Sequence, residues 1–285
     1  MLNFAIIIAI ILIATGLAVA GSDGGYAAGG VPVFAICVAI AFVTQWLAFV
    51  PAWLARTEKY YDLVGSTTYI IAILVAVALS PVRDARSYLL FCLVLIWALR
   101  LGTYLYRRVL AAGSDRRFDD IKRDFGKYLV AWTTQGLWVS FSLAAALAAV
   151  TSATRQDLGA FAAIGAALWV LGFTIEAVAD RQKREFRADA NNRDRFINTG
   201  LWAWSRHPNY FGEIALWLGV AVIAIPNLNG WQWATLLSPL FVYLLLTRIS
   251  GIPMLERYAD DKWGGDEDYE RYKALTPALL PRRPR

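Results

Sequence analysis

The sequence has few cysteines, few histidines and few charged residues for its length. Among 285 residues there are 2 cysteines and 1 histidine, and 18% are charged, against about 25% in soluble domains. Cys37 and Cys92 both lie inside apolar runs, so we expect neither a disulfide nor an exposed thiol. One histidine without a neighbouring cysteine also argues against zinc, and we predict no metal site. These shortages exclude a disulfide-stapled secreted domain and a zinc enzyme.

Apolar and aromatic residues are abundant instead. They include 12 Trp, 13 Tyr and 14 Phe, and the apolar share is 58%, with a mean hydropathy of +0.46. A soluble surface could not cover so much apolar bulk, and a disordered chain would not contain it. The composition therefore predicts an integral membrane protein.

Eight apolar runs approach the roughly 20 residues that a helix needs to cross a bilayer. Long continuous runs of this kind indicate helices and not the alternating strands of a membrane barrel. We predict an all-α polytopic bundle of 7–8 transmembrane helices, the fourth run being the least regular because Arg100 interrupts it. The runs are Leu2–Ala20, Val31–Leu54, Leu63–Ser80, Ser87–Tyr106, Leu129–Val150, Leu158–Val178, Phe211–Ile225 and Trp231–Leu246.

Basic residues gather in alternate connections between these runs. Connections 107–128 and 179–210 each hold seven Lys or Arg, and the tail after residue 246 holds eight. The other connections hold between none and two. By the positive-inside rule, both termini are cytoplasmic. We expect one membrane domain over 1–285, with N-terminal helices over 1–106 and a cofactor-binding part over 107–285. We place it in a bacterial inner membrane with its site facing the cytoplasm.

Four ionisable residues near the end of the sixth run share one helical face. At 100° per residue, Glu176, Asp180, Arg184 and Arg187 fall within about 80° of one another. This charged stripe begins inside the membrane and emerges on the basic side. It suits a ligand with a polar head at the deep end and phosphates at the shallow end. The alternative is that the charges pair along the helix and anchor its end at the headgroups.

A second polar motif occupies residues 199–217, with the sequence TGLWAWSRHPNYFGEIALW. Pro208 is typical of a first helical turn, whose free N–H groups favour anions. Asn209 and Glu213 lie four residues apart and therefore on one face of that helix. His207 precedes the proline and is either a helix cap or a proton donor.

Further polar groups lie in or beside the apolar runs. Asp62 begins the third run, where interfacial placement is the alternative to a site role. Arg100 and Tyr104 lie one turn apart and either contact an anionic ligand or anchor the helix end. Intramembrane ionisable residues are functional candidates by default because they are expensive to insert.

The string EAVADRQKREFRADANNRDRFINTGLWAWSRHPNYFGE resembles the steroid 5-alpha-reductase-like superfamily of membrane enzymes. Within that superfamily it is most similar to an uncharacterised bacterial branch. The resemblance is strongest over residues 172–285. Its RHP segment alone is less specific, because isoprenylcysteine carboxyl methyltransferases share it. The resemblance implies a bundle that holds NADPH in a cytoplasm-facing cavity. Hydride would then pass to an activated C=C bond of a lipophilic substrate, such as a steroid- or isoprenoid-like enone.

The resemblance also suggests which residues bind the cofactor. Those matching the family's cofactor-binding positions are Asp180, Arg187, Asn209, Glu213, Arg248 and Arg100. The charged stripe, the basic connection 179–210 and the second motif add further candidates for cofactor binding, namely Glu176, Arg184, Arg195, Arg206, His207 and Tyr210. No G-x-G-x-x-G follows a strand, so any nucleotide site is not of the Rossmann type.

The proton-donor half of the family's site is matched less well. Steroid reductases hold the enone oxygen with a Gln-Glu pair and a Tyr, whereas here Gln45 precedes Trp46, and Trp97 takes the tyrosine position. Asp62 and Tyr104 are then the candidate catalytic residues. A donor is required because hydride addition builds negative charge on the carbonyl oxygen.

Two other functions fit the sequence. An S-adenosylmethionine-dependent lipid methyltransferase would share the RHP segment, but such enzymes carry a Glu-Glu pair after the last helix, where this chain has the single Glu256. The second alternative is a non-catalytic protein that binds membrane lipids. Apart from the lipophilic substrate, we expect membrane lipids as partners and no nucleic acid, because a basic tail beside a membrane serves anionic lipids. The sequence leaves the oligomeric state open.

Overall fold

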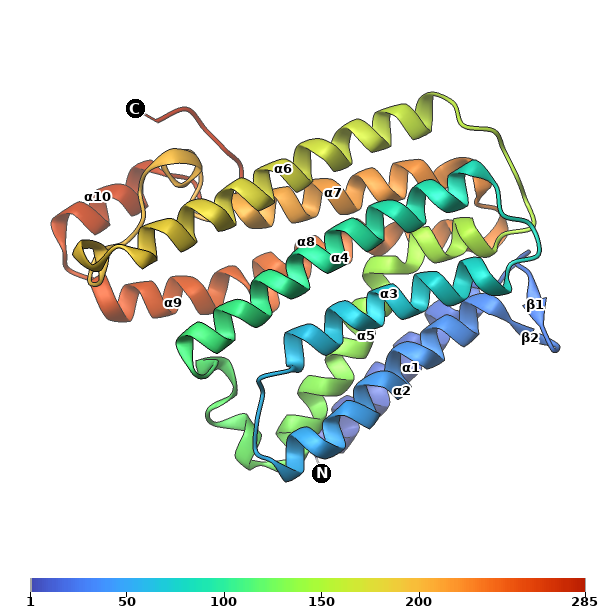
Figure 1. The fold of residues 1–285 in the computed structure, drawn as a ribbon, viewed down its shortest axis with the longest axis horizontal. Coiled ribbons are helices and arrows are strands. Elements are labelled where there is room, and N and C mark those ends of the chain that lie inside the picture. Colours follow the sequence, from blue (N-terminus) through green and yellow to red (C-terminus); the bar gives the residue numbers. More distant parts are fainter. Residues whose placement is uncertain (1, 285) are drawn as a thin grey trace. The chain divides into compact units, whose positions relative to one another are not determined.

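A computed structural model describes residues 2–284, apart from the side chain of Arg116. Within these residues, eight helices are long and apolar enough to cross a membrane. This confirms the all-α polytopic fold, and the protein is an integral membrane protein. The helices are α1 (Leu2–Gly21), α2 (Val33–Leu54), α3 (Tyr61–Leu79), α4 (Ala85–Ala112), α5 (Phe125–Thr151), α6 (Ala160–Ala188), α7 (Pro208–Ala224) and a last span from Gly230 to Trp263, shown in Figure 1.

Several helices differ from the apolar runs at their ends. α5 begins at Phe125, four residues before the predicted run, because Asp124 caps it by accepting a hydrogen bond from the backbone N–H of Lys127. α6 continues ten residues beyond Val178 to Ala188, so hydropathy located the apolar part of this helix but not its charged end. Cys92 is exposed on α4. The expectation that neither thiol is exposed is therefore wrong for Cys92.

The last span is interrupted where the sequence predicted one continuous helix. It opens with a 3₁₀-helix (Gly230–Leu237), continues as α8 (Ser238–Leu244) and widens into a π-helical turn (Leu245–Ile249). Two polar helices follow, α9 (Ile252–Trp263) and α10 (Glu267–Leu275). The described residues also include one small hairpin, β1 (Ala27–Ala28) with β2 (Val31–Pro32).

The chain divides into two compact units. Unit 1 comprises Met1–Ala163 with Val220–Ser238, and unit 2 comprises Ile164–Gly219 with Pro239–Arg285. These boundaries do not follow the division between residues 106 and 107. The expectation of one membrane domain over 1–285 stays a prediction, as does the cytoplasmic location of both termini.

In unit 1, α5 is the central helix. Inside the protein, 78% of its most apolar window is buried, against 22–44% for α1 to α4, and it packs against all four. Its second half is rich in small buried residues, including five alanines between positions 144 and 149. Small residues let helix backbones approach closely, which is the main source of packing energy between helices in lipid.

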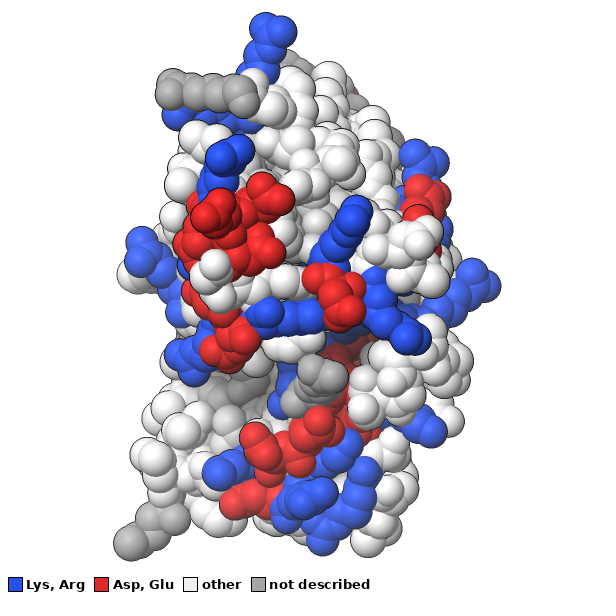
Figure 2. All heavy atoms as spheres, turned by 90° about the vertical axis from the view of Figure 1, so that its left-hand side faces the viewer, with Lys and Arg blue, Asp and Glu red and all other residues white. Residues whose placement is uncertain are grey.

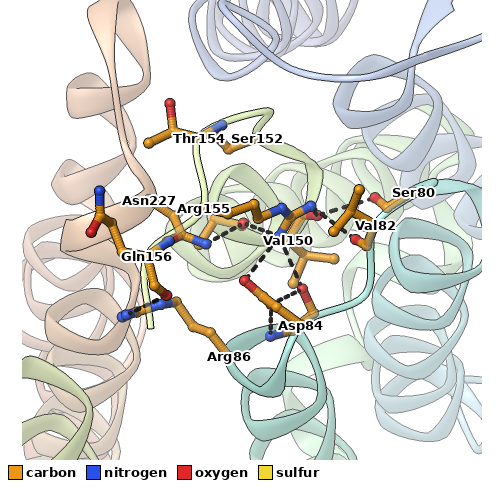
Figure 3. A network of polar contacts seen from close by, with 12 residues as sticks. Ser80, Val82, Asp84, Arg86, Val150, Ser152, Thr154, Arg155, Gln156 and Asn227 are labelled. Atoms are coloured by element: carbon orange, nitrogen blue, oxygen red, sulfur yellow. Dashed lines mark hydrogen bonds and ion pairs between the residues drawn. The ribbon is translucent and has the colours of Figure 1, made fainter. Parts of the chain in front are cut away.

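Arg86 is one of two arginines that tie together the connections at one end of unit 1 (Figure 3). Only 1% of this residue is exposed. Its Nη1 donates to the carbonyl of Ile223 at 2.6 Å, and its Nη2 donates to those of Asp157 at 2.7 Å and Gln156 at 3.2 Å. A buried guanidinium is tolerated because it satisfies carbonyls that would otherwise lack donors.

Arg155 is the second of these arginines (Figure 3). It donates to the carbonyls of Val82 at 3.0 Å and Val150 at 2.9 Å, and it forms an ion pair with Asp84 at 3.5 Å. Asp84 in turn caps α4 by accepting from the backbone of Ser87 at 2.8 Å. Both arginines occur in connections with few basic residues, so their role is to join loops and not to orient the chain.

We expect Arg86→Met to destabilise the protein by about 3 kcal/mol, because the buried carbonyl of Ile223 and the partly buried carbonyls of Gln156 and Asp157 lose a charged donor. Arg83→Met is the matched control, since Arg83 is exposed and bonds only the carbonyls of Val77 and Ala78 near its own position. Denaturation of the purified protein in one detergent measures both. Equal losses for the two variants would contradict the role given to Arg86.

A carboxylate–arginine cluster, formed by Glu58, Asp115, Arg117 and Lys122, holds together the connection after α2 and the connection after α4 in unit 1. Glu58 is 4% exposed; it accepts from Lys122 Nζ at 2.9 Å and from the backbone N–H of Asp115 at 3.0 Å. Burial alone would raise the pKa of Glu58, but these hydrogen bonds hold it below its ordinary value. Burial likewise acts against ionised Asp115, while the Arg117 guanidinium lowers the pKa of that carboxyl. The loop 113–124 is therefore held by charge as well as by Phe118, which is buried among aromatic rings.

This cluster predicts a loss of stability in acid. The folded pKa of Glu58 lies below its ordinary value of 4.5, so the folded state binds fewer protons than the unfolded state as the pH falls below that value. The stabilisation is present above pH 4.5 and is lost below it. Glu58→Gln should lower the unfolding temperature at neutral pH and flatten its decline in acid.

Asp119→Asn is the control for that experiment, because Asp119 pairs with the same lysine but its side chain is 53% exposed. Unfolding temperatures measured from pH 7 to 3 separate the variants. If Glu58→Gln followed the wild-type curve in parallel, the cluster would not be the source of the acid sensitivity.

Candidate functional site

The site in unit 2 begins with an unusually close contact between α6 and α7, which lie side by side in Figure 1. A Cβ added at Gly172 would lie 2.5 Å from the carbonyl oxygen of Gly212, and one added at Gly219 would lie 2.5 Å from that of Gly165. Only glycine allows two backbones to approach this closely. The two glycine pairs fix which residues of α6 face which residues of α7.

This contact brings the charged stripe to the polar face of α7. Asn209 Nδ2 donates to Asp180 Oδ1 at 3.3 Å, and a Cβ on Gly212 would lie 2.6 Å from the backbone nitrogen of Glu176. Glu176, Asp180 and Glu213 are all buried, at 2%, 4% and 8% exposure. Two motifs 29 residues apart in the sequence thus form one polar surface, although their role as cofactor ligands stays a prediction.

The burial and the charge of the stripe both change along α6. Glu176 and Asp180 are buried, whereas Arg184 and Arg187 are exposed one to two turns further on. The helix therefore presents acceptors at its buried end and guanidinium groups at its exposed end. This is the distribution that the sequence indicated for a ligand with a polar head and a phosphate-bearing remainder.

Two buried polar atoms near the start of α7 have no hydrogen-bond partner among the described residues. They are Asn209 Oδ1 and His207 Nδ1. Buried polar atoms are nearly always hydrogen-bonded, so each such exception requires an explanation. Both atoms can accept a hydrogen bond, and a ligand with N–H or O–H groups would satisfy them. On this observation the residues suit a ligand that donates hydrogen bonds, as the hydroxyl and amide groups of a nucleotide do.

The other nitrogen of His207 is engaged. Its Nε2 lies 2.7 Å from Glu256 Oε1, and Arg206 donates to the same carboxylate at 3.0 and 3.1 Å. Burial lowers the pKa of His207 below its ordinary value; the contact with Glu256 opposes this, while the charges of Lys183 and Arg206 add to it. Glu256 is not among the site residues predicted from the sequence, and the one local signal for it is its place just after the last apolar run.

Arg206 also holds the end of the chain. Its Nη1 donates to the carbonyls of Lys273 at 2.6 Å and Thr276 at 2.7 Å, and its backbone N–H donates to Pro277. The backbone N–H of Arg282 then donates to Trp204. With its donors used in this way, Arg206 is placed as a structural anchor, and its predicted contact with a cofactor stays a prediction.

A polar cavity of about 800 Å³ lies beside this anchor. The end of α6, the loop after it, α9, α10 and the tail all contribute to its wall. Arg195 lines it, together with aromatic side chains and acidic residues of α10 and the preceding turn. Among its lining residues are Phe186, Asp194, Arg195, Phe196, Trp263, Asp266, Arg271, Tyr272 and Arg282. Figure 2 shows Lys and Arg side chains mixed with Asp and Glu on one face of the molecule, so this face is not uniformly basic.

Two further predicted site residues of unit 2, Arg248 and Tyr210, differ in their surroundings. Arg248 is exposed and lies in the π-helical turn, where Ser250 N–H donates to the Leu245 carbonyl at 2.9 Å. Turns of this kind are frequent at functional sites. The Tyr210 ring stacks on His207 with centroids 5.7 Å apart and planes 12° apart.

The remaining predicted residues belong to unit 1. The Arg100 guanidinium lies 5.6 Å from the centroid of the Tyr104 ring on α4. Further along α4, Arg108 pairs with Asp62 at 3.3 Å, and Arg117 pairs with it at 3.1 Å. Asp62 therefore lies in the carboxylate–arginine cluster.

Trp97 and Gln45, the departures from the family pattern, are both buried in unit 1. Trp97 packs edge-on against Tyr69 at 5.0 Å, and Tyr69 donates to Ser142 at 3.1 Å. Gln45 donates to Thr68 at 2.8 Å. Within residues 2–284 no group of three or more His, Cys, Asp or Glu side chains is placed to hold a metal ion.

The glycine contact gives a prediction about stability. Gly172→Ala places a methyl group against the α7 backbone, and overpacking of this kind costs about 1–3 kcal/mol. Gly16→Ala is the control, because a Cβ there meets nothing within 4 Å. Thermal unfolding in detergent should show a clear loss for the first variant and none for the second. An unchanged Gly172→Ala would show that the two backbones are not in contact.

Comparison with known proteins identifies one family and two relatives. The model of a family described as a protein of unknown function (DUF1295) matches residues 48–276. The chain is 33% identical over 117 residues to 3-oxo-5-alpha-steroid 4-dehydrogenase 1 of Bos taurus, which covers 41% of each chain. It is 24% identical over 207 residues to an uncharacterised protein of Schizosaccharomyces pombe, covering 62% of this chain and 60% of the other. The chain thus spans less than two thirds of either relative. No solved structure matches it.

Proposed function

The chain belongs to the DUF1295 family, and we propose that it is an NADPH-dependent reductase of a C=C bond in a lipophilic substrate within the membrane. The observation that carries the proposal is the α6–α7 surface, where buried Asp180 bonds half-buried Asn209 and the exposed Arg184 and Arg187 follow along α6. The partial similarity to a steroid dehydrogenase supports the same class of reaction.

The residues of this surface divide into two groups. Arg184 and Arg187 would bind phosphate oxygens, for which a guanidinium is suited by its planar, bidentate geometry. Asp180, Asn209 and His207 would orient the nicotinamide end through hydrogen bonds at the buried end of the stripe. When bound, NADPH supplies the hydride, and the protein provides its placement and the exclusion of water.

For the proton we favour Tyr104 over Asp62. Asp62 accepts hydrogen bonds from both Arg108 and Arg117, so this carboxylate is already engaged by two guanidinium groups. Tyr104 carries a phenol O–H and lies on α4 beside Arg100. A phenol hydroxyl that contacts the substrate would stabilise the negative charge that develops on a carbonyl oxygen during reduction.

Ligand binding tests the proposed function. A ligand at 100 times its dissociation constant stabilises the folded state by about 2.7 kcal/mol. NADPH should therefore raise the unfolding temperature of the purified protein, and S-adenosylmethionine should not. The opposite result would favour the methyltransferase. Asp180→Ala and Arg187→Ala should weaken NADPH binding, whereas Arg181→Ala, on another face of α6, should not.

The assignment of the proton donor has its own test. Tyr104→Phe should retain NADPH binding and lose turnover, measured as NADPH oxidation with membrane lipid extracts and as a mass gain of two hydrogens. Asp62→Asn should lower the unfolding temperature and retain turnover per folded molecule. Full turnover in Tyr104→Phe together with its loss in Asp62→Asn would assign the donor to Asp62.

A further inference from the structure

Resting on the proposed function, we infer that Glu256 is a positioning residue that fixes the tautomer of His207. In this arrangement the imidazole donates from Nε2 to Glu256 and presents Nδ1 as a bare acceptor to the nicotinamide nucleotide. Glu256 itself does not touch the ligand. It acts through the single histidine of the chain.

The first support is the geometry of the carboxylate. Glu256 Oε1 lies 2.7 Å from His207 Nε2, and Arg206 contacts both carboxylate oxygens. The arginine therefore keeps the carboxylate charged and stationary, and an ionised carboxylate can only accept hydrogen bonds. In neutral His207 the proton must then be on Nε2, and Nδ1 has a lone pair.

The second support is the state of that lone pair. His207 is 5% exposed, and its Nδ1 is buried without a hydrogen-bond partner. A purely structural His–Glu pair would place its free nitrogen in solvent or against a donor, because an unsatisfied buried atom is costly. The same lack of a partner occurs two residues away at Asn209 Oδ1, on the residue that bonds Asp180. Two unsatisfied acceptors at one helix start indicate a ligand that offers donors, as a carboxamide or a ribose does.

The third support is rigidity. Tyr210 stacks on the imidazole, and the backbone N–H of His207 donates to Ser205 Oγ at 3.2 Å. Burial also lowers the pKa of His207, which keeps it neutral at neutral pH. The charged groups around it are Glu256, Arg206 and Lys183.

Nuclear magnetic resonance of the unaltered protein tests the tautomer. Since the chain has one histidine, ¹⁵N-labelled histidine gives a single imidazole, and its nitrogen shifts identify the protonated atom. We expect the Nε2–H tautomer without ligand, and a change at Nδ1 on saturation with NADPH. A proton on Nδ1, or an Nδ1 signal unmoved at saturation, would overturn the inference.

Variants separate positioning from structure. Asparagine carries a polar atom near the position of Nδ1, and glutamine carries one near Nε2. His207→Gln and Glu256→Gln should each weaken NADPH binding about tenfold, the effect of one hydrogen bond to a bound ligand, and His207→Asn should weaken it less than His207→Gln does. In the His207→Asn background, Glu256→Gln should have little further effect.

A merely structural pair gives a different pattern. His207→Gln, which keeps the contact with Glu256, would then be the better tolerated variant, in affinity and in ligand-free unfolding temperature alike. Asp261→Asn, an exposed carboxyl on the same helix, is the control and should change neither. If wild-type protein does not bind NADPH, the proposed function fails; the ligand-free tautomer still reports whether Glu256 fixes His207.

Discussion

The candidate site depends on the contact between the backbones of α6 and α7. Three glycines, Gly172, Gly212 and Gly219, let these helices approach until an added Cβ would overlap the backbone of the opposite helix. Without that approach, Asp180 would not reach Asn209, and the charged stripe would face lipid or solvent alone. Membrane helices gain their packing energy from such close contacts, because lipid gives no hydrophobic drive for association. The same glycines therefore stabilise unit 2 and align its polar residues.

Charged residues form four groups with separate roles in this protein. In unit 1, Arg86 and Arg155 are buried donors for loop carbonyls, and Glu58, Asp115 and their cationic partners hold the loop 113–124. In unit 2, Arg206 and Glu256 join the start of α7 to the tail and fix His207. Arg184 and Arg187 remain exposed. The net charge of +6 is thus the sum over groups with different roles. Among these groups, the exposed Arg184 and Arg187 are suited to a phosphate-bearing ligand.

Much of the fold follows from hydropathy, whereas the site follows only partly. Runs of apolar residues located eight spans. A 100° helical period placed four charged residues on one helical face, and all four lie within α6, namely Glu176, Asp180, Arg184 and Arg187. Contacts between distant segments were beyond that reasoning: no local pattern pairs Asp180 with Asn209, or His207 with Glu256 across 49 residues. Asp62 illustrates the same limit, because its two arginine partners come from α4 and the loop after it. Glycine spacing along α6 and α7 was the one local signal for their contact, and it becomes informative once the two helices are known to be neighbours.

We propose that the α6–α7 surface holds a nicotinamide dinucleotide phosphate. A structure of the protein determined with saturating NADPH tests it most directly. We expect nucleotide density along the charged stripe, with the nicotinamide end beside Asp180, Asn209 and His207 and the phosphates beside Arg184 and Arg187. Nucleotide density at another place, or an unchanged stripe at saturation, would contradict it.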